Sequence, residues 1–573
     1  MLANLNVPGV YVQEITTLPP SVAAVETAIP AFLGYTQLTE TAAGESLVDQ
    51  PVRISSQIEY EAIFGFGPPV AVTEVELDAA LNFVRSDLRV RYYLYDAIRL
   101  FFANGGGDCY VVCTGGYAFD GSGDAEIVDT DFTDADRALE AIAKVDEPTL
   151  LLFPDMAATD ATALTDVQKA ALLQCGDLQD RFGIFDLIRE DTTNRPPSAP
   201  DPAKAPGQDF RDAIGVNSLS YGAVYTPWLK TKLYHPVSYP LLENITIRFA
   251  DGSTLTGFDH SQLHNDDTDI EAFMRIGRVK TAHADIQLNA PADAAALTTA
   301  LDELEANPPV SPLPAAVTDA RSDLDTAIGA YDGTDANTLA DLEAAFDAYH
   351  AALIDAFDPD ANLRRIFPAY RTIANGIEND ISYQPPSGAV AGVYARVDAA
   401  RGVWKAPANE SILGVVGPDV RYTQSQLGNL NIHTSGKSIN AIRAFPGRGT
   451  LIFGARTLAG NDGEYKYINV RRLLIFLEES IKKATESFVF EPNDANTWLR
   501  VRGMIENFLN LQWRAGALQG AKAADAYRVA IGLGQTMTAQ DVLAGRMIVD
   551  ISLAPVRPAE FIVLHFSQQQ AQS

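Results

Sequence analysis

Short apolar runs alternate with amphipathic stretches over about residues 30–236 of the chain. Runs rich in β-branched and aromatic residues predict strands, and apolar residues at helical spacing predict helices between them. We expect strands at 31–35, 109–113, 149–153 and 182–188, separated by helices at 95–103, 135–145 and 166–175. This regular alternation predicts an α/β layer structure whose strands are mainly parallel.

Residues 285–361 have a different pattern, with 16 acidic residues, one basic residue and an alanine-rich background. Part of this segment repeats apolar residues at helical spacing, which predicts an amphipathic helix. The repeated positions are Leu339, Leu342, Phe346, Tyr349 and Leu353. We interpret the segment as an inserted helical module on the outside of the protein, and a disordered acidic segment is the alternative.

From about residue 385 the chain is richer in strand, turn and aromatic signals, and two further helices are predicted. One spans 469–486, and the other follows Asp494, a residue type that caps helix N-termini. Their apolar stripes, which we interpret as core, are Leu473, Leu477 and Ile481 and then Trp498, Val501, Ile505, Phe508 and Leu511. Three cations, Arg500, Arg502 and Arg514, are predicted on or beside the solvated side of the second helix, available to an acidic surface.

Both ends of the chain are predicted to form strands. Termini are usually polar unless something ties them down, yet β-branched and aromatic residues crowd both ends of this chain. The two runs are Val10, Tyr11, Val12, Gln13 and Glu14 at the start and Glu560, Phe561, Ile562, Val563, Leu564, His565 and Phe566 at the end. Such tails either pair within their own fold or add a strand to the sheet of a neighbouring molecule.

The charge of the chain is divided unevenly between its two parts. At 573 residues it is too long for one core, so roughly two to four domains are expected. Residues 391–573 hold 20 basic and 15 acidic residues, a net charge of +5. Because the net charge of the whole chain is −31, the first 390 residues carry −36. This asymmetry indicates two faces with different neighbours, and it argues against nucleic acid as a partner of the acidic part.

The sequence contains no sign of membrane insertion or secretion. No apolar run approaches the roughly 20 residues that span a bilayer, and the first residues lack the basic and apolar blocks of a signal peptide. Three cysteines, Cys109, Cys113 and Cys175, are too few for a disulfide framework and are interpreted as buried thiols. We therefore expect synthesis in a reducing cytoplasm.

A search for catalytic or metal-binding patterns is negative. Gly436-Lys437-Ser438 resembles the end of a phosphate-binding loop, but Asn431 stands where the first glycine of that loop is required. His260 and His264 are four residues apart, but the aspartates around them favour an exposed loop over a metal site. We predict no catalytic residue, no cofactor and no metal.

Segments along nearly the whole chain resemble the contractile tail sheath proteins of phages and of phage-like bacterial injection systems. The similarity keeps the order of the family and is densest after residue 385. The matching segments are 8–14, 101–106, 109–112, 223–229, 385–392, 401–409, 445–449, 454–458, 467–473, 490–493 and 555–561. Two departures are Phe453, where a tryptophan is expected, and the region from about 237 to 362, which has no clear counterpart.

The resemblance implies an α/β and α+β multidomain fold with an inner and an outer part. Residues 1–30 are expected to be an arm of the inner domain, and residues 363–573 the rest of that α+β lattice domain with its terminal strand arm. Residues 31–236 are expected to form the outer α/β domain. Residues 237–362 are expected to be the acidic, partly helical insertion in that outer domain.

The function implied by the resemblance is structural. The chain would polymerise helically around an inner tube and contract to drive the tube into a target envelope, with both terminal strands adding to sheets of neighbouring subunits. Its partners would be itself, the inner tube protein, and baseplate and tail terminator or cap proteins. The particle would assemble in the bacterial cytoplasm, and its later release from the cell is left open. From the residues alone, a soluble α/β enzyme and a self-contained binding module remain alternatives.

Overall fold

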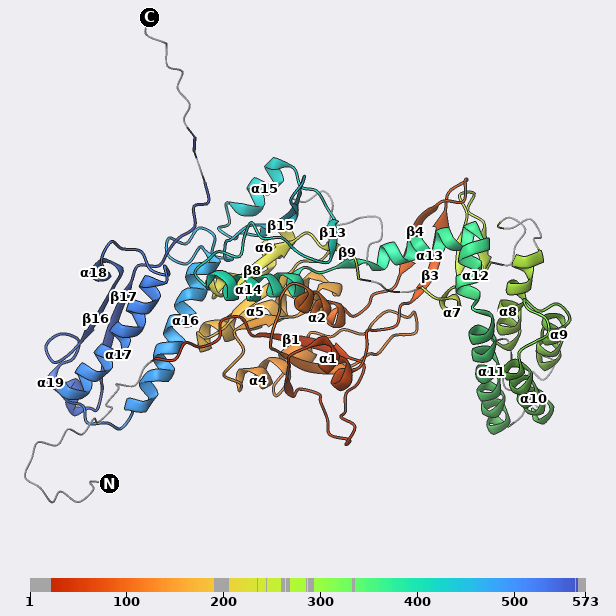
Figure 1. Ribbon diagram of the computed structural model, residues 1–573, viewed down its shortest axis with the longest axis horizontal. Coiled ribbons are helices and arrows are strands. Elements are labelled where there is room, and N and C mark those ends of the chain that lie inside the picture. The colour runs from red at the N-terminus through yellow and green to blue at the C-terminus, as the bar shows by residue number, and fades with distance from the viewer. Residues whose placement is uncertain are drawn as a thin grey trace, which may run out of the picture.

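The computed structural model is an elongated molecule with three hydrophobic cores. A central domain of helices and strands lies between a peripheral domain, at the right of Figure 1, and a C-terminal domain at its left. The residues described are 22–189, 206–233, 235, 237–243, 245–258, 263, 268–284, 286, 293–331, 335–561 and 563–564. The chain therefore has the mixed α/β, multidomain fold with several sheets that the sequence predicts.

An eight-stranded sheet forms the middle of the central domain, in the order β15-β14-β8-β7-β6-β1-β5-β2. Neighbouring strands from β14 to β5 are parallel, whereas the edge strands β2 and β15 pair antiparallel. The strands are β1 (Pro30–Thr36), β2 (Pro51–Ile54), β5 (Cys109–Gly116), β6 (Leu150–Leu152), β7 (Phe182–Asp186), β8 (Gly222–Thr226), β14 (Asn440–Phe445) and β15 (Gly449–Phe453). The four predicted strands and their mainly parallel arrangement are thus confirmed.

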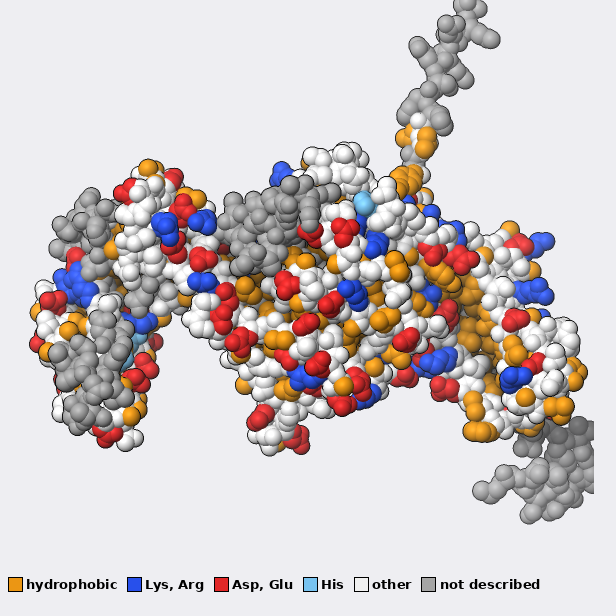
Figure 2. Space-filling view, turned by 180° about the vertical axis from the view of Figure 1, so that it is seen from behind, with side chains coloured by type: hydrophobic (Ala, Val, Ile, Leu, Met, Phe, Trp, Pro, Cys, Tyr) orange, Lys and Arg blue, Asp and Glu red, His pale blue; other side chains and the backbone are white. Residues whose placement is uncertain are grey.

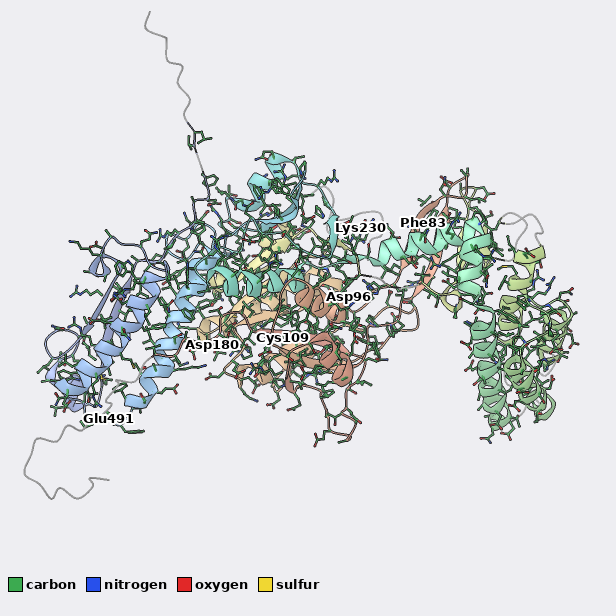
Figure 3. The ribbon with its side chains drawn as sticks, in the orientation of Figure 1. Phe83, Asp96, Cys109, Asp180, Lys230 and Glu491 are labelled. Carbon is green, nitrogen blue, oxygen red and sulfur yellow. The ribbon has the colours of Figure 1, made fainter. Side chains whose placement is uncertain are left out.

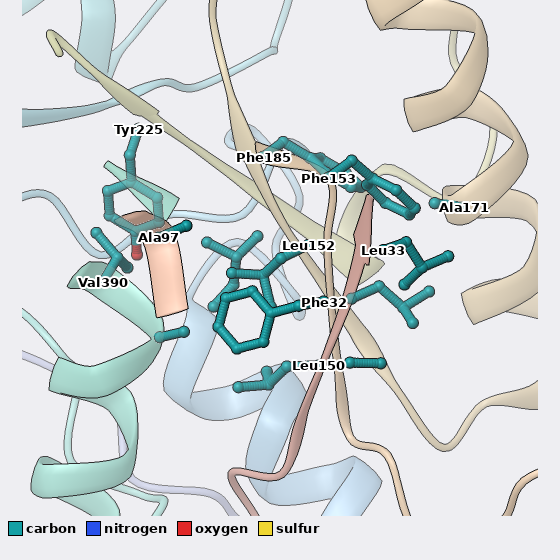
Figure 4. Packing of buried hydrophobic residues seen from close by; sticks show 14 of the residues in the cluster. Phe32, Leu33, Ala97, Leu150, Leu152, Phe153, Ala171, Phe185, Tyr225 and Val390 are labelled. Atoms are coloured by element: carbon teal, nitrogen blue, oxygen red, sulfur yellow. The ribbon is translucent and has the colours of Figure 1, made fainter. Parts of the chain in front are cut away.

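Helices pack on both faces of this sheet, as Figure 4 shows. Ala97 of α2 and Val390 of α14 lie on one side of the strands, and Ala171 of α5 lies on the other. Strands covered on both faces need nearly continuous apolar sequence, and Phe32 and Leu152 are accordingly fully buried. The central helices are α1 (Gln57–Phe64), α2 (Leu94–Ala103), α3 (Thr130–Thr133), α4 (Ala138–Ala143), α5 (Ala161–Leu178), α6 (Gln208–Ala213), α14 (Ser387–Arg401) and α15 (Gln424–Asn431).

A buried carboxylate joins three segments of the central domain. Asp155 follows β6, and its Oδ2 accepts a hydrogen bond from the backbone N–H of Tyr35 in β1 at 2.8 Å. Its Oδ1 accepts two more at the start of α2, from the N–H groups of Tyr93 and of Leu94, the latter at 2.8 Å. Burial raises the pKa of Asp155 to about 6, against the effect of these three N–H groups, which favour the ionised carboxylate. Its charge lies at the positive end of the α2 dipole.

The peripheral domain combines a four-stranded sheet with a group of helices. The sheet has the order β11-β10-β3-β4, and its core includes Val75 of β3 and Ile247 of β10. Its elements are β3 (Val72–Leu77), β4 (Phe83–Leu88), α7 (Tyr239–Leu242), β10 (Thr246–Arg248), β11 (Thr254–Thr256), α8 (Thr268–Ala284), α9 (Asp293–Ala306), α10 (Ala315–Ala330), α11 (Ala336–Phe357), α12 (Pro359–Ile366) and α13 (Pro368–Ile381). Most of the described part of the acidic segment 285–361 is helical, including the amphipathic helix predicted there, and the repeated apolar residues of that helix, α11, are buried or partly buried.

The C-terminal domain packs two long helices and a two-stranded sheet around a third core. Its elements are α16 (Ile468–Thr485), α17 (Ala495–Arg514), α18 (Ala523–Ala526), β16 (Tyr527–Ile531), α19 (Ala539–Leu543) and β17 (Val549–Leu553). Asp494 caps α17 as predicted, accepting hydrogen bonds from the N–H groups of Asn496 and Thr497. Leu511 differs from its predicted place in the core, because 56% of its surface is exposed near the end of α17.

The three cores divide the chain at other positions than the predicted domain ranges. Residues 72–88 fell in the predicted outer domain 31–236, but they pair with β10 in the peripheral domain, which extends to α13. Residues 387–453 fell in the predicted inner domain 363–573, but α14, β14 and β15 complete the central domain. The boundaries differ because strands pair with distant segments of the chain. For example, β14 pairs in parallel with β8 and so joins the central sheet. A small sheet of β9 (Leu229–Thr231), β12 (Tyr383–Gln384) and β13 (Val415–Pro418) adds to the central domain.

The three cysteines are buried free thiols, as predicted. The Sγ of Cys113 accepts a hydrogen bond from Thr36 Oγ1 at 3.0 Å, and Cys175 faces the core of the central domain. Within the described ranges, no helix has both the length and the apolar character that crossing a bilayer requires.

Candidate functional site

The C-terminal domain contains a sheet with an open edge beside an apolar groove. β17 pairs with β16, and in the described part of the chain no strand pairs with its other edge. A groove of about 1300 Å³ lies between this edge and α16. Hydrophobic side chains line it, and Figure 2 shows such side chains gathered in the hollow beside the C-terminal domain. The hydrophobic lining includes Leu474, Leu477 and Ile481 of α16, Phe488, and Ile551 and Leu553 of β17, and the charged residues Glu478 and Lys482 of α16 also line the groove.

The open edge of β17 has the chemistry of a strand acceptor. In an antiparallel pair, alternate residues direct their N–H and C=O groups away from the partner strand, so β17 presents a row of unpaired backbone groups. Its residues alternate, with Val549, Ile551 and Leu553 partly buried and Asp550 and Ser552 exposed. An added strand would therefore find hydrogen-bonding groups along the edge and apolar side chains along the groove.

The N-terminal end of the described chain runs along α16. Val22 and Val25 pack on the C-terminal core, and the N–H of Val25 donates to Ser480 Oγ at 3.2 Å. The carbonyl of Thr27 accepts a hydrogen bond from Arg472 at 2.7 Å. The predicted strand residues Val10, Tyr11, Val12, Gln13 and Glu14 lie outside the described residues.

The C-terminal end changes character at Glu560. Before it, the N–H of Val556 donates to the carbonyl of Ala517 at 3.2 Å, so the segment lies on its own subunit. After it, apolar side chains are exposed: Phe561 by 68%, Val563 by 73% and Leu564 by 71%. Ile562, His565 and Phe566, which complete the predicted strand, lie outside the described residues.

Glu560 itself is held inside its own subunit, although it was grouped with the exchanged strand. Its carboxylate accepts hydrogen bonds from Arg456 at 2.7 and 2.9 Å, from Asn431 Nδ2 at 2.6 Å and from the Tyr467 hydroxyl at 3.0 Å. Burial alone would raise the pKa of Glu560, but the hydrogen bonds from Arg456 and Asn431 outweigh it and hold the pKa below its usual value. A run of strand-forming residues could not reveal this contact, because Arg456 is distant in sequence.

The three candidate cations lie on α17 but do not form one cluster. Arg500 pairs with Glu491 at 3.2 Å and Arg502 with Glu506 at 2.7 Å, and both side chains are about half exposed. Successive helical residues are rotated by about 100°, so Arg500 and Arg502 flank the buried stripe on opposite sides. Arg514 is exposed in the last turn. Glu491 marks the tip of the C-terminal domain in Figure 3.

The residues considered for chemistry have structural roles or are not described. The Lys437 ammonium is buried and donates to the carbonyl of Arg211, so it fixes the segment before β14 to α6. His260 and His264 lie outside the described residues. Among the residues that are described, no group of three or more histidines, cysteines and acids is arranged to hold a metal ion.

The acceptor strand and Arg456 were not identified from the sequence. The alternation of apolar and polar residues from Val549 to Leu553 was the available signal for a half-buried strand. Arg456 stands in one of the segments, 454–458, that carried the resemblance, but no local pattern indicates that it is buried. Only the folded chain places it beside Glu560.

Two family models match the chain. The first, for the phage tail sheath protein central domain, matches residues 319–458, and the second, for the phage tail sheath C-terminal domain, matches residues 461–569. The tail sheath protein of Salmonella phage ViI is 27% identical over 184 residues, which cover 32% of this chain and 28% of that protein. The tail sheath protein of Vibrio phage KVP40 is 26% identical over 189 residues, which cover 32% of this chain and 26% of that protein. The matches thus span less than a third of either relative.

Solved structures resemble the chain over almost its whole length. A chain of the anti-feeding prophage baseplate, solved by cryo-electron microscopy, is 26% identical with a TM-score of 0.54, covering 98% of this chain and 99% of that one. A chain of the PVC sheath complex in the contracted state, from an extracellular contractile injection system, is 26% identical with a TM-score of 0.54, and the match covers 98% of this chain and 98% of that one. A chain of the anti-feeding prophage helical sheath in the contracted state is 26% identical with a TM-score of 0.53, and the match covers 98% of this chain and 99% of that one.

Proposed function

Because this chain belongs to the phage tail sheath family, we propose that it is the structural subunit of a contractile sheath and not an enzyme. It polymerises helically around an inner tube and contracts to drive the tube into a target envelope. It works within a phage tail or an extracellular contractile injection system and assembles in the bacterial cytoplasm. Besides other copies of itself, it contacts the tube protein, the baseplate and a terminator or cap protein.

One observation carries the proposal: the described part of the chain has both a sheet edge with no strand paired to it and an exposed apolar tail. The tail residues Phe561, Val563 and Leu564 are each more than two-thirds exposed. Each backbone hydrogen bond of an added strand contributes roughly 1 kcal/mol net. Each apolar side chain that enters the groove adds about 1.5–3 kcal/mol, and the ordering of the arm opposes part of this gain. The run from Val10 to Glu14 is the second arm.

The division of charge supports an orientation of the subunit. The acidic peripheral domain points outward, and the C-terminal domain with its cations points towards the tube. The terminal arms keep the subunits linked while they rotate and slide during contraction, so no catalytic residue is needed.

Electron microscopy of the purified chain tests the proposal. A sheath subunit forms long striated cylinders, and removing residues 1–14 abolishes them while the protein stays folded. A self-contained binding module or an enzyme gives monodisperse particles from the intact chain, and that result would rule out the sheath assignment.

Reversing the α17 cations is expected to weaken assembly on isolated tubes. The variant Arg500→Glu, Arg502→Glu and Arg514→Glu loses two exposed ion pairs, each of which contributes only about 0–1 kcal/mol to folding. It should therefore fold but repel an acidic tube, and sedimentation with purified tubes measures the bound fraction. Lys169→Glu, which breaks an exposed pair with Asp166 in the central domain, is the matched control. Unchanged binding of the triple variant removes these cations from the tube interface.

A further inference from the structure

The boundary between the fixed and the exposed part of the C-terminal tail coincides with a largely buried ion pair. We name Asn431, Arg456, Tyr467 and Glu560 the arm clamp. Arg456 and Glu560 expose 6% and 19% of their side chains, and the guanidinium binds the carboxylate through two N–H groups. This two-point geometry is stronger and more directional than a single ion contact. Among the described residues, the exposed apolar run starts directly after it, at Phe561.

The arm clamp is built on the framework of the central domain. The third guanidinium nitrogen of Arg456, Nη1, donates to the carbonyl of Gly460 at 2.9 Å, and the backbone N–H of Arg456 donates to Asn440 Oδ1 in β14 at 2.9 Å. Tyr467 immediately precedes α16, and Asn431 ends α15. The carboxylate of Glu560 thus joins the tail to the sheet and to two helices at once.

We propose that the arm clamp fixes the point at which the C-terminal arm leaves its subunit, and so sets the reach and register of the strand given to the neighbour. This inference rests on the proposed sheath function. Without the clamp, the next described attachment is at Val556, whose carbonyl accepts a hydrogen bond from Asn469 at 3.1 Å. Four more residues would then be free, which adds roughly 13 Å of slack at about 3.3 Å per residue.

Slack of this size has a defined consequence for an added strand. A shift of one residue along a strand moves every side chain to the opposite face of the sheet. An arm with four extra free residues can pair with the acceptor edge in several registers, of which one places Phe561 and Val563 correctly. It also transmits no tension between subunits until it is fully extended. Glu560 is therefore a positioning residue and does not itself enter the neighbour's groove.

The test compares Glu560→Gln with a matched control in the full-length protein. Glu560→Gln keeps the shape of the side chain but removes the charge that Arg456 binds. Asp419→Asn removes the charge from another buried pair, Arg189–Asp419 at 2.8 Å in the central domain, away from both ends of the chain. Hydrogen exchange of the unassembled protein measures the arm, and cryo-electron microscopy of the cylinders measures lattice order.

We expect Glu560→Gln to raise the exchange rate of residues 556–560 at least tenfold, without a change in β14 or α16, and to give fewer and poorly ordered cylinders. Asp419→Asn should leave both measurements of the arm and lattice unchanged. Cylinders of Glu560→Gln with wild-type order would overturn the proposed role of the arm clamp. Hydrogen exchange that rises throughout the protein would also overturn it, because the ion pair would then be a general folding contact. If the wild-type chain itself forms no cylinders, the sheath function fails, whatever the exchange data for residues 556–560.

Discussion

A chain that lacks residues 561–573 is expected to fold normally and to form no cylinders. Phe561, Val563 and Leu564 are each at least 68% exposed in the subunit, so their removal should change the free energy of unfolding by less than about 0.5 kcal/mol. In the sheath, the same deletion removes a whole strand with its hydrogen bonds and about 1.5–3 kcal/mol for each apolar side chain that the groove buries. Electron microscopy and thermal unfolding of the two chains measure the two effects.

A shorter deletion is the control for this experiment. Removing only residues 569–573, which are Gln, Gln, Ala, Gln and Ser, keeps the apolar part of the arm and should leave the cylinders intact. Cylinders of normal length from the chain that ends at Glu560 would show that the C-terminal arm is not a link of the lattice.

The substitution Asp155→Ala is expected to lower the free energy of unfolding by about 3–5 kcal/mol. It leaves the N–H groups of Tyr35, Tyr93 and Leu94 without their acceptor in a site that water does not reach. Each such buried donor costs about 1–3 kcal/mol, and the loss of the buried charge, with its own desolvation cost, offsets part of the sum. Urea denaturation of a chain that ends at Glu560, which stays unassembled, gives the measurement.

Asp160→Ala provides the contrast for Asp155→Ala. Asp160 also accepts two N–H groups at a helix start, those of Thr162 and Ala163, but it does so in water at the start of α5. The loss of the Asp160 cap should lower the free energy of unfolding by only about 1 kcal/mol. Equal effects of the two substitutions would show that Asp155 is an ordinary helix cap and not the junction of β1, β6 and α2.

Much of the local structure could be predicted, because local structure depends on local sequence. The apolar run at residues 31–35 and the spacing of Leu473, Leu477 and Ile481 each indicate one element, and the structure contains both. The division into domains could not be predicted in the same way. Nothing in residues 72–77 indicates that they pair with β10, since a strand acquires its partner only when distant segments meet.

The residues of the candidate site could be predicted only in part, for the same reason. Strand-forming residues at both ends of the chain indicate the donor that we propose, whereas the acceptor that we propose, the edge of β17, is recognised only once the pairing of the described strands is known. Glu560 was assigned to the donor because it adjoins Phe561, and a carboxylate next to a strand gives no sign of its partner. Its contact with Arg456 bridges about 100 residues and exists only in the fold.

The pairing of β8 with β14 has a consequence for synthesis of the protein. When β8 leaves the ribosome, the strand that will cover its edge is still about 200 residues away. At about 5–20 residues per second, this edge stays open for roughly 10–40 s, while the peripheral domain is completed in between. Exposed parallel edges are sites of faulty association between nascent chains. Cells that make many copies at once should therefore depend on chaperones that bind the protein before residue 440 is translated.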